Sequence, residues 1–69
     1  MPLTMAGTGS QFTVKKINGR DDVRRFLSSL GFVEGEPVSV VSELGGNLIV
    51  NVKESRIALS KGMASRIMV

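Results

Sequence analysis

The feature that most constrains the fold is the stretch 21–31, because it is the one segment of the chain with a clear helical pattern. Its apolar residues recur at the spacing that forms a single stripe along an α-helix: Val23, Phe26, Leu27 and Leu30. Asp21 and Asp22 favour a helix start, since negative charge suits the N-terminal end of the helix dipole, and Gly31 is typical of a left-handed C-terminal cap. We therefore predict one helix here, with its apolar stripe packed against a sheet.

The segments around this helix alternate between apolar and polar residues, which is typical of half-buried strands. We predict strands over residues 11–17, 38–43, 47–52, 55–59 and 66–69. Turn-forming residues separate them: Asn18-Gly19, Gly35 with Pro37, Gly45-Gly46 and Lys53-Glu54. Residues 61–64 break the alternation and are expected to form one helical turn. Residues 1–10 have the composition of a tail, in which Leu3 and Met5 indicate partial docking.

About five short strands, with one helix inserted after the first, predict a mainly β fold: a small closed barrel in a single domain over residues 1–69. Closure removes the exposed edges that a short open sheet would carry. The alternation assigns a set of apolar side chains to the interior: Phe12, Val14, Val38, Val40, Leu48, Val50, Val52, Ile57, Leu59, Ile67 and Val69.

The composition excludes several functional classes. The 69 residues include no histidine and no cysteine, so the commonest general base and the commonest ligands of transition metals are both missing. The serines therefore have no histidine to activate them. Ser60 and Lys61 do not form a catalytic pair either, because neighbouring strand residues face apart. We predict that the protein is not an enzyme.

The charge pattern argues against nucleic-acid binding. Nine basic and six acidic residues give a net charge of +3, the basic residues are scattered, and the only aromatic residues are three phenylalanines. Nucleic-acid binding needs a clustered basic face, ideally with stacking rings. The chain also lacks a secretory signal pattern and any apolar run long enough to span a membrane. These features and the absence of cysteine fit the cytoplasm.

Two weaker candidates for function remain. Glu34 and Glu36 flank Gly35 in a loop, where hard cations find oxygen ligands, although solvated acidic residues are the more common case. The alternation also turns three apolar side chains outward, Val41, Ile49 and Met68, which would form a contact patch if they clustered. Incidental exposure, or burial where a strand bulges, is the favoured alternative.

The run RRFLSSLGFVEGEPVSVV resembles the signature of the ferrous iron transport protein A family (FeoA domain). The positions that carry the resemblance are Arg24, Arg25, Leu27, Leu30, Gly31, Phe32, Gly35, Val38 and Val40. The stretch NLIVNVKESRIALSKGMASRIMV is similar to the closing half of the family, and Pro2-Leu3 and Gly9 fit its opening. The resemblance therefore covers nearly the whole chain.

This resemblance implies an SH3-like β-barrel and a cytoplasmic accessory role in bacterial ferrous iron uptake. The implied partner is the cytosolic region of the membrane iron permease (FeoB), which the protein would bind and modulate without catalysis and without entering the membrane. We expect the partner-binding residues to be Arg20, Arg24, Arg25, Leu30, Gly31, Phe32, Gly35 and Ile49. For Phe32 we favour the alternative of a core residue at the helix end.

The sequence leaves four further points open. One alternative function is an Fe2+ carrier, or a regulatory domain like the one that ends iron-dependent repressors. A second alternative is a small nucleic-acid-binding barrel. A bound divalent transition metal such as Fe2+ and self-association into a homo-oligomer are compatible with the sequence, and neither has assigned ligands or an assigned interface.

Overall fold

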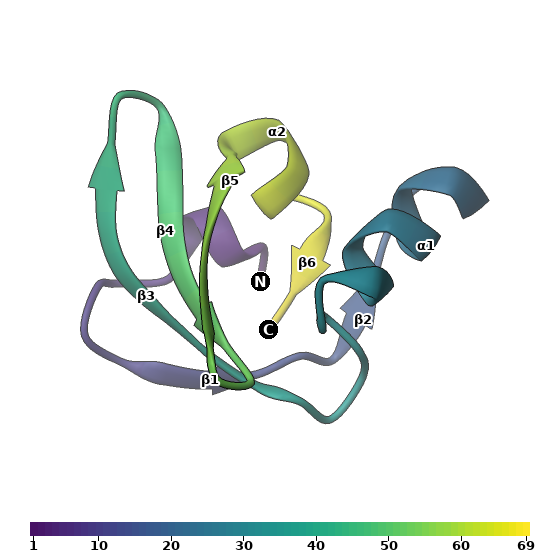
Figure 1. The fold of residues 1–69 in the computed structure, drawn as a ribbon, viewed down its shortest axis with the longest axis horizontal. Helices are drawn as coiled ribbons and strands as arrows, with labels where there is room; N and C mark the ends of the chain where they lie inside the picture. Colours follow the sequence, from purple (N-terminus) through teal and green to yellow (C-terminus); the bar gives the residue numbers. More distant parts are fainter.

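The computed structural model describes residues 1–69 and shows a barrel of two small sheets with helix α1 on one side (Figure 1). The elements in chain order are η1 (Leu3–Met5), β1 (Gln11–Thr13), β2 (Lys16–Ile17), α1 (Asp21–Ser29), β3 (Pro37–Leu44), β4 (Asn47–Val52), β5 (Ser55–Ser60), α2 (Lys61–Ala64) and β6 (Ile67–Met68). The larger sheet has the order β1-β3-β4-β5, the smaller pairs β2 with β6, and every pairing is antiparallel. The predicted mainly β fold, with its one longer helix after the first strand segment, is confirmed.

The first predicted strand is wrong in one respect, because residues 11–17 form two strands that belong to different sheets. The chain changes partner at Val14, whose N–H donates to the carbonyl of Glu36 while its own carbonyl accepts from the N–H of Gly35. The next N–H, that of Lys15, donates to the carbonyl of Met68. One continuous alternating segment therefore turns the corner of the barrel, and Val14 is fully buried at that corner.

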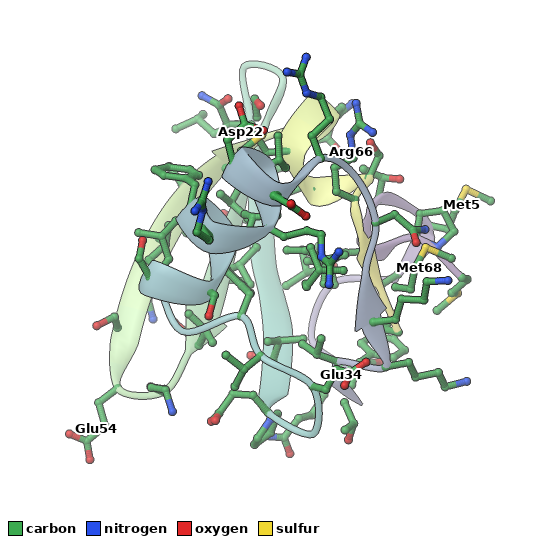
Figure 2. The ribbon with its side chains drawn as sticks, turned by 90° about the vertical axis from the view of Figure 1, so that its right-hand side faces the viewer. Met5, Asp22, Glu34, Glu54, Arg66 and Met68 are labelled. Atoms are coloured by element: carbon green, nitrogen blue, oxygen red, sulfur yellow. The ribbon has the colours of Figure 1, made fainter.

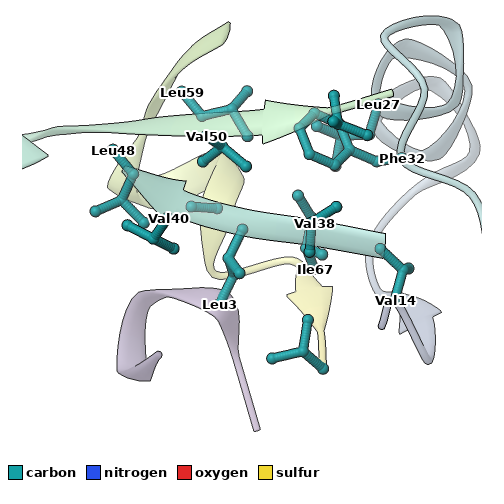
Figure 3. Close-up of a cluster of buried hydrophobic side chains, with 13 residues drawn as sticks. Leu3, Val14, Leu27, Phe32, Val38, Val40, Leu48, Val50, Leu59 and Ile67 are labelled. Atoms are coloured by element: carbon teal, nitrogen blue, oxygen red, sulfur yellow. The ribbon is translucent and has the colours of Figure 1, made fainter. Parts of the chain in front are cut away.

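The C-terminal end of α1 has the predicted glycine cap. Gly31 has a φ of 109°, and its N–H donates to the carbonyl of Ser28, while the N–H of Phe32 donates to the carbonyl of Leu27. These two bonds define a Schellman motif, which usually includes an apolar contact across the turn. Leu27 and Phe32 are both completely buried and lie beside each other at the helix end of the core (Figure 3).

The N-terminal end of α1 has no side-chain cap. Arg20 occupies the cap position and makes no side-chain capping bond, although Asp21 and Asp22 lie in the first turn as predicted. The apolar stripe is also narrower than its spacing indicates. Leu27 is fully buried, and Val23 and Leu30 pack against the core, but Phe26 is 49% exposed. Phe26 lies at the flank of the stripe, where this small barrel offers nothing to cover it.

The hairpins follow the predicted turns. Gly45 and Gly46 both have positive φ, 58° and 84°, as the favoured two-residue hairpin turn requires. Lys53 also has a positive φ, of 53°, in the turn between β4 and β5. Strand β3 contains a bulge: Val40 pairs with Val50 and Ser42 pairs with Ile49, so Val41 is an extra residue.

The core is a single cluster of thirteen apolar side chains drawn from every part of the chain (Figure 3). It includes most of the residues assigned to the interior, and Phe12 and Ile57 pack against it while partly exposed. Leu3 is completely buried, so part of the N-terminal segment docks, whereas Met5 is 72% exposed. The carbonyl of Met1 also accepts from the N–H of Val69, and Pro2 pairs with Met68. The N-terminal segment therefore extends the smaller sheet beyond β6.

Candidate functional site

An open groove runs between α1, β2 and the segment that follows the helix, on the face shown in Figure 2. It has a volume of about 760 Å³. The residues that line it are Lys16, Ile17, Asn18, Gly19, Asp21, Arg24, Arg25, Ser28, Phe32, Val33 and Glu34. The antiparallel pairing of β2 with β6 fixes the strand that forms one wall of the groove. The Schellman turn at Gly31 sets the path of the residues after α1, which close one end of the groove. The groove is thus fixed by the two features that anchor α1 to the barrel.

The helix contributes most of the charge in this groove. Arg24 lies 3.6 Å from the Asp21 carboxylate, one helical turn away, and Arg20 lies 3.9 Å from Asp22 just above it. All four side chains are well exposed, so these pairs are weak and exchange readily with solvent. Arg25 makes no ion pair and borders both the groove and a smaller hollow beside Arg20. The basic helix face is therefore available to a partner.

Two basic residues that the sequence analysis did not select join this face. Lys16, on β2, lines the groove opposite the helix. Arg66, just before β6, covers Gly19: a Cβ atom placed on that glycine would lie 3.6 Å from Nη1 of Arg66. The two are separated by 50 positions in sequence, and only the pairing of β2 with β6 brings them to the same region. In a closed barrel, strands that are distant in sequence are expected to pair. The residue types do not reveal the register of the β2–β6 pairing, which brings Lys16 and Arg66 to the same region.

The other predicted partner-binding residues divide into three groups. Leu30 is half-buried and Gly31 is buried at the helix end, where both residues shape the turn. Phe32 is completely buried, which corrects its assignment as a partner anchor and favours the alternative of a core residue. Gly35 is exposed with a φ of 87° in the turn before β3. Ile49 lies on the outer face of β4, paired with Ser42 and Ala58, and does not line the groove.

The predicted outward apolar patch does not form as a set of three. Val41 and Ile49 belong to neighbouring strands of the larger sheet. Met68 belongs to the smaller sheet, where it pairs with Lys16 and Pro2 and lies near Met5 in Figure 2. All three side chains are only partly exposed. The structure therefore separates Met68 from the other two and favours burial or incidental exposure over one shared surface.

The carboxylates do not assemble a metal site. No three His, Cys, Asp or Glu side chains lie close enough together to hold a metal ion. In the predicted loop, Glu36 forms an ion pair with Lys53, whose Nζ lies 2.9 Å from Oε1, while Glu34 lines the groove. The commonest ligands of transition metals, imidazole and thiolate groups, are missing from this chain. The donors present do not fit a resident transition metal.

None of the helices has the length and apolar character that a membrane crossing needs.

Residues 1–69 match the sequence model of the FeoA domain family. A Methanocaldococcus jannaschii protein named as an Fe(2+) transport protein A is 35% identical over 68 residues, which cover 99% of this chain and 83% of that protein. A crystal structure of an iron uptake regulatory protein (FeoA) is 31% identical and superposes with a TM-score of 0.89, covering 97% of this chain and 91% of that one.

A second crystal structure is that of Stenotrophomonas maltophilia FeoA complexed with zinc. It is 32% identical, with a TM-score of 0.85 over 99% of this chain and 87% of that one, and it is described as an SH3 domain protein. A manganese-dependent transcriptional repressor shares the fold with a TM-score of 0.86 at 21% identity. These matches define an SH3-like β-barrel with a helix inserted after its first strand segment. The chain belongs to the FeoA domain family, whose relatives are named for ferrous iron transport.

Proposed function

We propose that this protein is a cytoplasmic accessory protein of ferrous iron uptake that docks on the cytosolic region of the iron permease FeoB. It modulates iron passage through that contact and catalyses no reaction. Family membership over residues 1–69 supports the link to iron transport. The observation that carries the docking role is the exposed groove beside α1, which is lined by three basic and two acidic side chains and contains no assembled metal ligands.

The docking surface in this proposal is built from α1 and the turn that follows it. Arg20, Arg24 and Arg25 supply exposed positive charge, which raises the rate of encounter and sets orientation at the rim of an interface. Gly35 shapes the exposed turn beyond the helix. Phe32 supports the same surface from beneath, through its burial against Leu27. Ile49 lies on a different face and would serve only a partner that reaches around the barrel.

One alternative has a specific observation in its favour, namely a role as a direct Fe2+ carrier. The Stenotrophomonas maltophilia relative forms a complex with zinc, and a role as a ferrous iron transport activating factor has been put forward for it. In this chain a carrier would depend on scattered carboxylates, of which Glu36 is already bonded to Lys53. Such a site would be weak, because the chain has neither the imidazole of histidine nor the thiolate of cysteine. We favour docking over carriage for this reason.

A pull-down against the soluble cytosolic region of the permease tests the proposal. We expect the wild-type protein to be retained and the double variant Arg24→Glu/Arg25→Glu to be lost. The variant Arg56→Glu, which reverses one charge instead of two, is the control, because Arg56 is an exposed basic residue on β5, outside the groove. Absence of wild-type binding would refute the proposal.

Anaerobic calorimetry with Fe(II) separates docking from carriage. A docking protein is expected to show no stoichiometric heat of Fe(II) binding. A saturable one-to-one isotherm would favour the carrier instead.

A further inference from the structure

We infer that the groove between α1 and β2 receives an acidic segment of a partner protein, with the carboxylates of that segment at the end near Arg25 and Arg66. The inference deepens the proposed docking function and rests on it for the identity of the partner. It adds the chemistry of the bound segment, its direction in the groove, and two contact residues, Lys16 and Arg66.

Some basic side chains form no ion pair within the chain, and their positions show where a partner carboxylate could bind. Four of the nine basic side chains face a carboxylate, namely Arg20, Arg24, Lys53 and Lys61. The five without such a partner are Lys15, Lys16, Arg25, Arg56 and Arg66. Two of these five, Lys16 and Arg25, line one groove, and Arg66 lies beside Gly19 in the wall of that groove. A partner carboxylate here would gain ion pairs that the free protein does not satisfy internally.

The two ends of the groove also differ in charge. Arg66 lies toward one end of the face in Figure 2, and Glu34 lies toward the other. Glu34 makes no ion pair within the chain, so it disfavours a second negative charge at its end of the groove. A bound segment is therefore expected to be acidic at the Arg66 end and neutral or basic at the Glu34 end. Charge complementarity of this kind sets orientation as well as attraction.

The apolar groups of the groove favour a peptide over a nucleic acid. Ile17 is half-buried and Val33 is 36% exposed, so the groove offers apolar contact between its charged ends. Its only ring, that of Phe32, is completely buried and unavailable for base stacking. Single-stranded nucleic acids rely on such stacking and on uniformly positive grooves. Asp21 and Glu34 would repel a continuous phosphate backbone, whereas a peptide can place a different side chain beside each of them.

The test uses the full chain and a fluorescein-labelled synthetic peptide, Glu-Glu-Glu-Leu-Gly-Lys, with fluorescence anisotropy at low and high salt. The control peptide carries Gln in place of each Glu. Protein variants Lys16→Glu and Arg25→Glu alter the groove, and Arg56→Glu makes the same change of net charge on the outer sheet face. Changes in the backbone amide chemical shifts of the isotope-labelled protein on addition of the peptide show where the peptide binds.

We expect the Kd for the acidic peptide to rise roughly tenfold in each groove variant and to change less than about twofold in Arg56→Glu. The affected amides should belong to residues 16–19, 24–28 and 33–34. Equal loss in Arg56→Glu, equal binding of the Gln peptide, or tighter binding of duplex DNA than of the acidic peptide would overturn the inference.

A parallel measurement with the permease region separates this inference from the proposed function. If the permease region binds wild type and Arg25→Glu equally, the groove assignment fails and docking stands. If the acidic peptide binds as expected and the permease region does not bind at all, docking on the permease fails and the groove assignment stands.

Discussion

The Nζ atom of Lys53 lies 2.9 Å from Oε1 of Glu36, and this contact joins the β4–β5 turn to the residue before β3. The methylene groups of the same lysine cover Gly31, with Cδ 3.4 Å from the position of a Cβ there. One side chain therefore holds the helix end and the turn that follows it against the far hairpin. The ion pair and the apolar contact can be separated by substitution.

Lys53→Met removes the charge and keeps an apolar side chain over Gly31, so we expect a loss of about 0.2–1 kcal/mol in the free energy of unfolding. Lys53→Ala removes the stem as well and should cost more. Urea denaturation measures both. Added salt should narrow the gap between wild type and Lys53→Met, because screening weakens an exposed pair. Equal losses in the two variants would show that the stem contributes nothing.

Gly31→Ala is expected to lower the free energy of unfolding by about 1–3 kcal/mol, because an alanine is strained at positive φ. The new methyl group would also touch the Lys53 stem, with Cδ 3.4 Å away, whereas the control position, Gly35, has no such neighbour. Gly35→Ala is the matched control, since Gly35 has a φ of 87° but nothing within 4 Å of its Cβ position. We expect the control to show only the backbone strain, and thus the smaller loss. A larger loss at Gly35 would contradict the role assigned to Lys53.

Phe32 and Phe26 provide a contrast between a buried ring and an exposed one. Phe32→Ala removes a completely buried ring and should cost about 3–5 kcal/mol, which is enough to unfold a domain of this size. Phe32→Leu keeps much of the volume and should leave a folded protein that has lost about 1.5 kcal/mol or less. Phe26→Ala should cost well under that amount, since its ring is 49% exposed. Circular dichroism with thermal unfolding checks the order of the three variants.

The N-terminal segment offers a second contrast. Leu3→Ala is expected to cost about 2–5 kcal/mol, because Leu3 is completely buried in the core. Met5→Ala should change the free energy of unfolding by about 0.5 kcal/mol or less, as is usual for a surface position. Urea denaturation again reports both. Similar values for the two variants would mean that the segment does not pack as described.

Gly45→Asn is expected to leave the fold intact and to raise the free energy of unfolding by roughly 0.4–1 kcal/mol. Gly45 has a φ of 58°, which asparagine tolerates, and the substitution restricts the unfolded chain. Asn followed by glycine is also the preferred pair in a two-residue hairpin turn of this kind. A drop in thermal midpoint would show that the turn depends on glycine at both positions.

Local chemistry made much of this fold predictable. The cap at Gly31, the glycine hairpin, and the inward sides of β3 and β4 all follow from residue types and spacing within a few positions. The partner change at Val14 does not, because residues 11–17 alternate without interruption and only the closure of the barrel forces the corner. The apolar character of Leu3 indicates that it docks, but its place in the core depends on a distant part of the chain.

The candidate site was predictable only from its helical side. Arg24 and Arg25 were found because they share a helix and a family signature. Lys16 and Arg66 were missed because a scattered set of basic residues becomes a group only after β2 and β6 pair. The same limitation explains Phe26, whose helical spacing suits the apolar stripe but whose neighbours in space leave it uncovered.

The extra residue at Val41 has a consequence for how relatives should be aligned. It shifts the phase of β3, so that Glu43 shares a side with Leu48 and reaches Lys61, while Leu44 projects into solvent. In a homologous strand without the extra residue, the positions equivalent to Glu43 and Leu44 would exchange faces of the sheet. A gap placed at this position would therefore mark a change of register and not a loss of the strand.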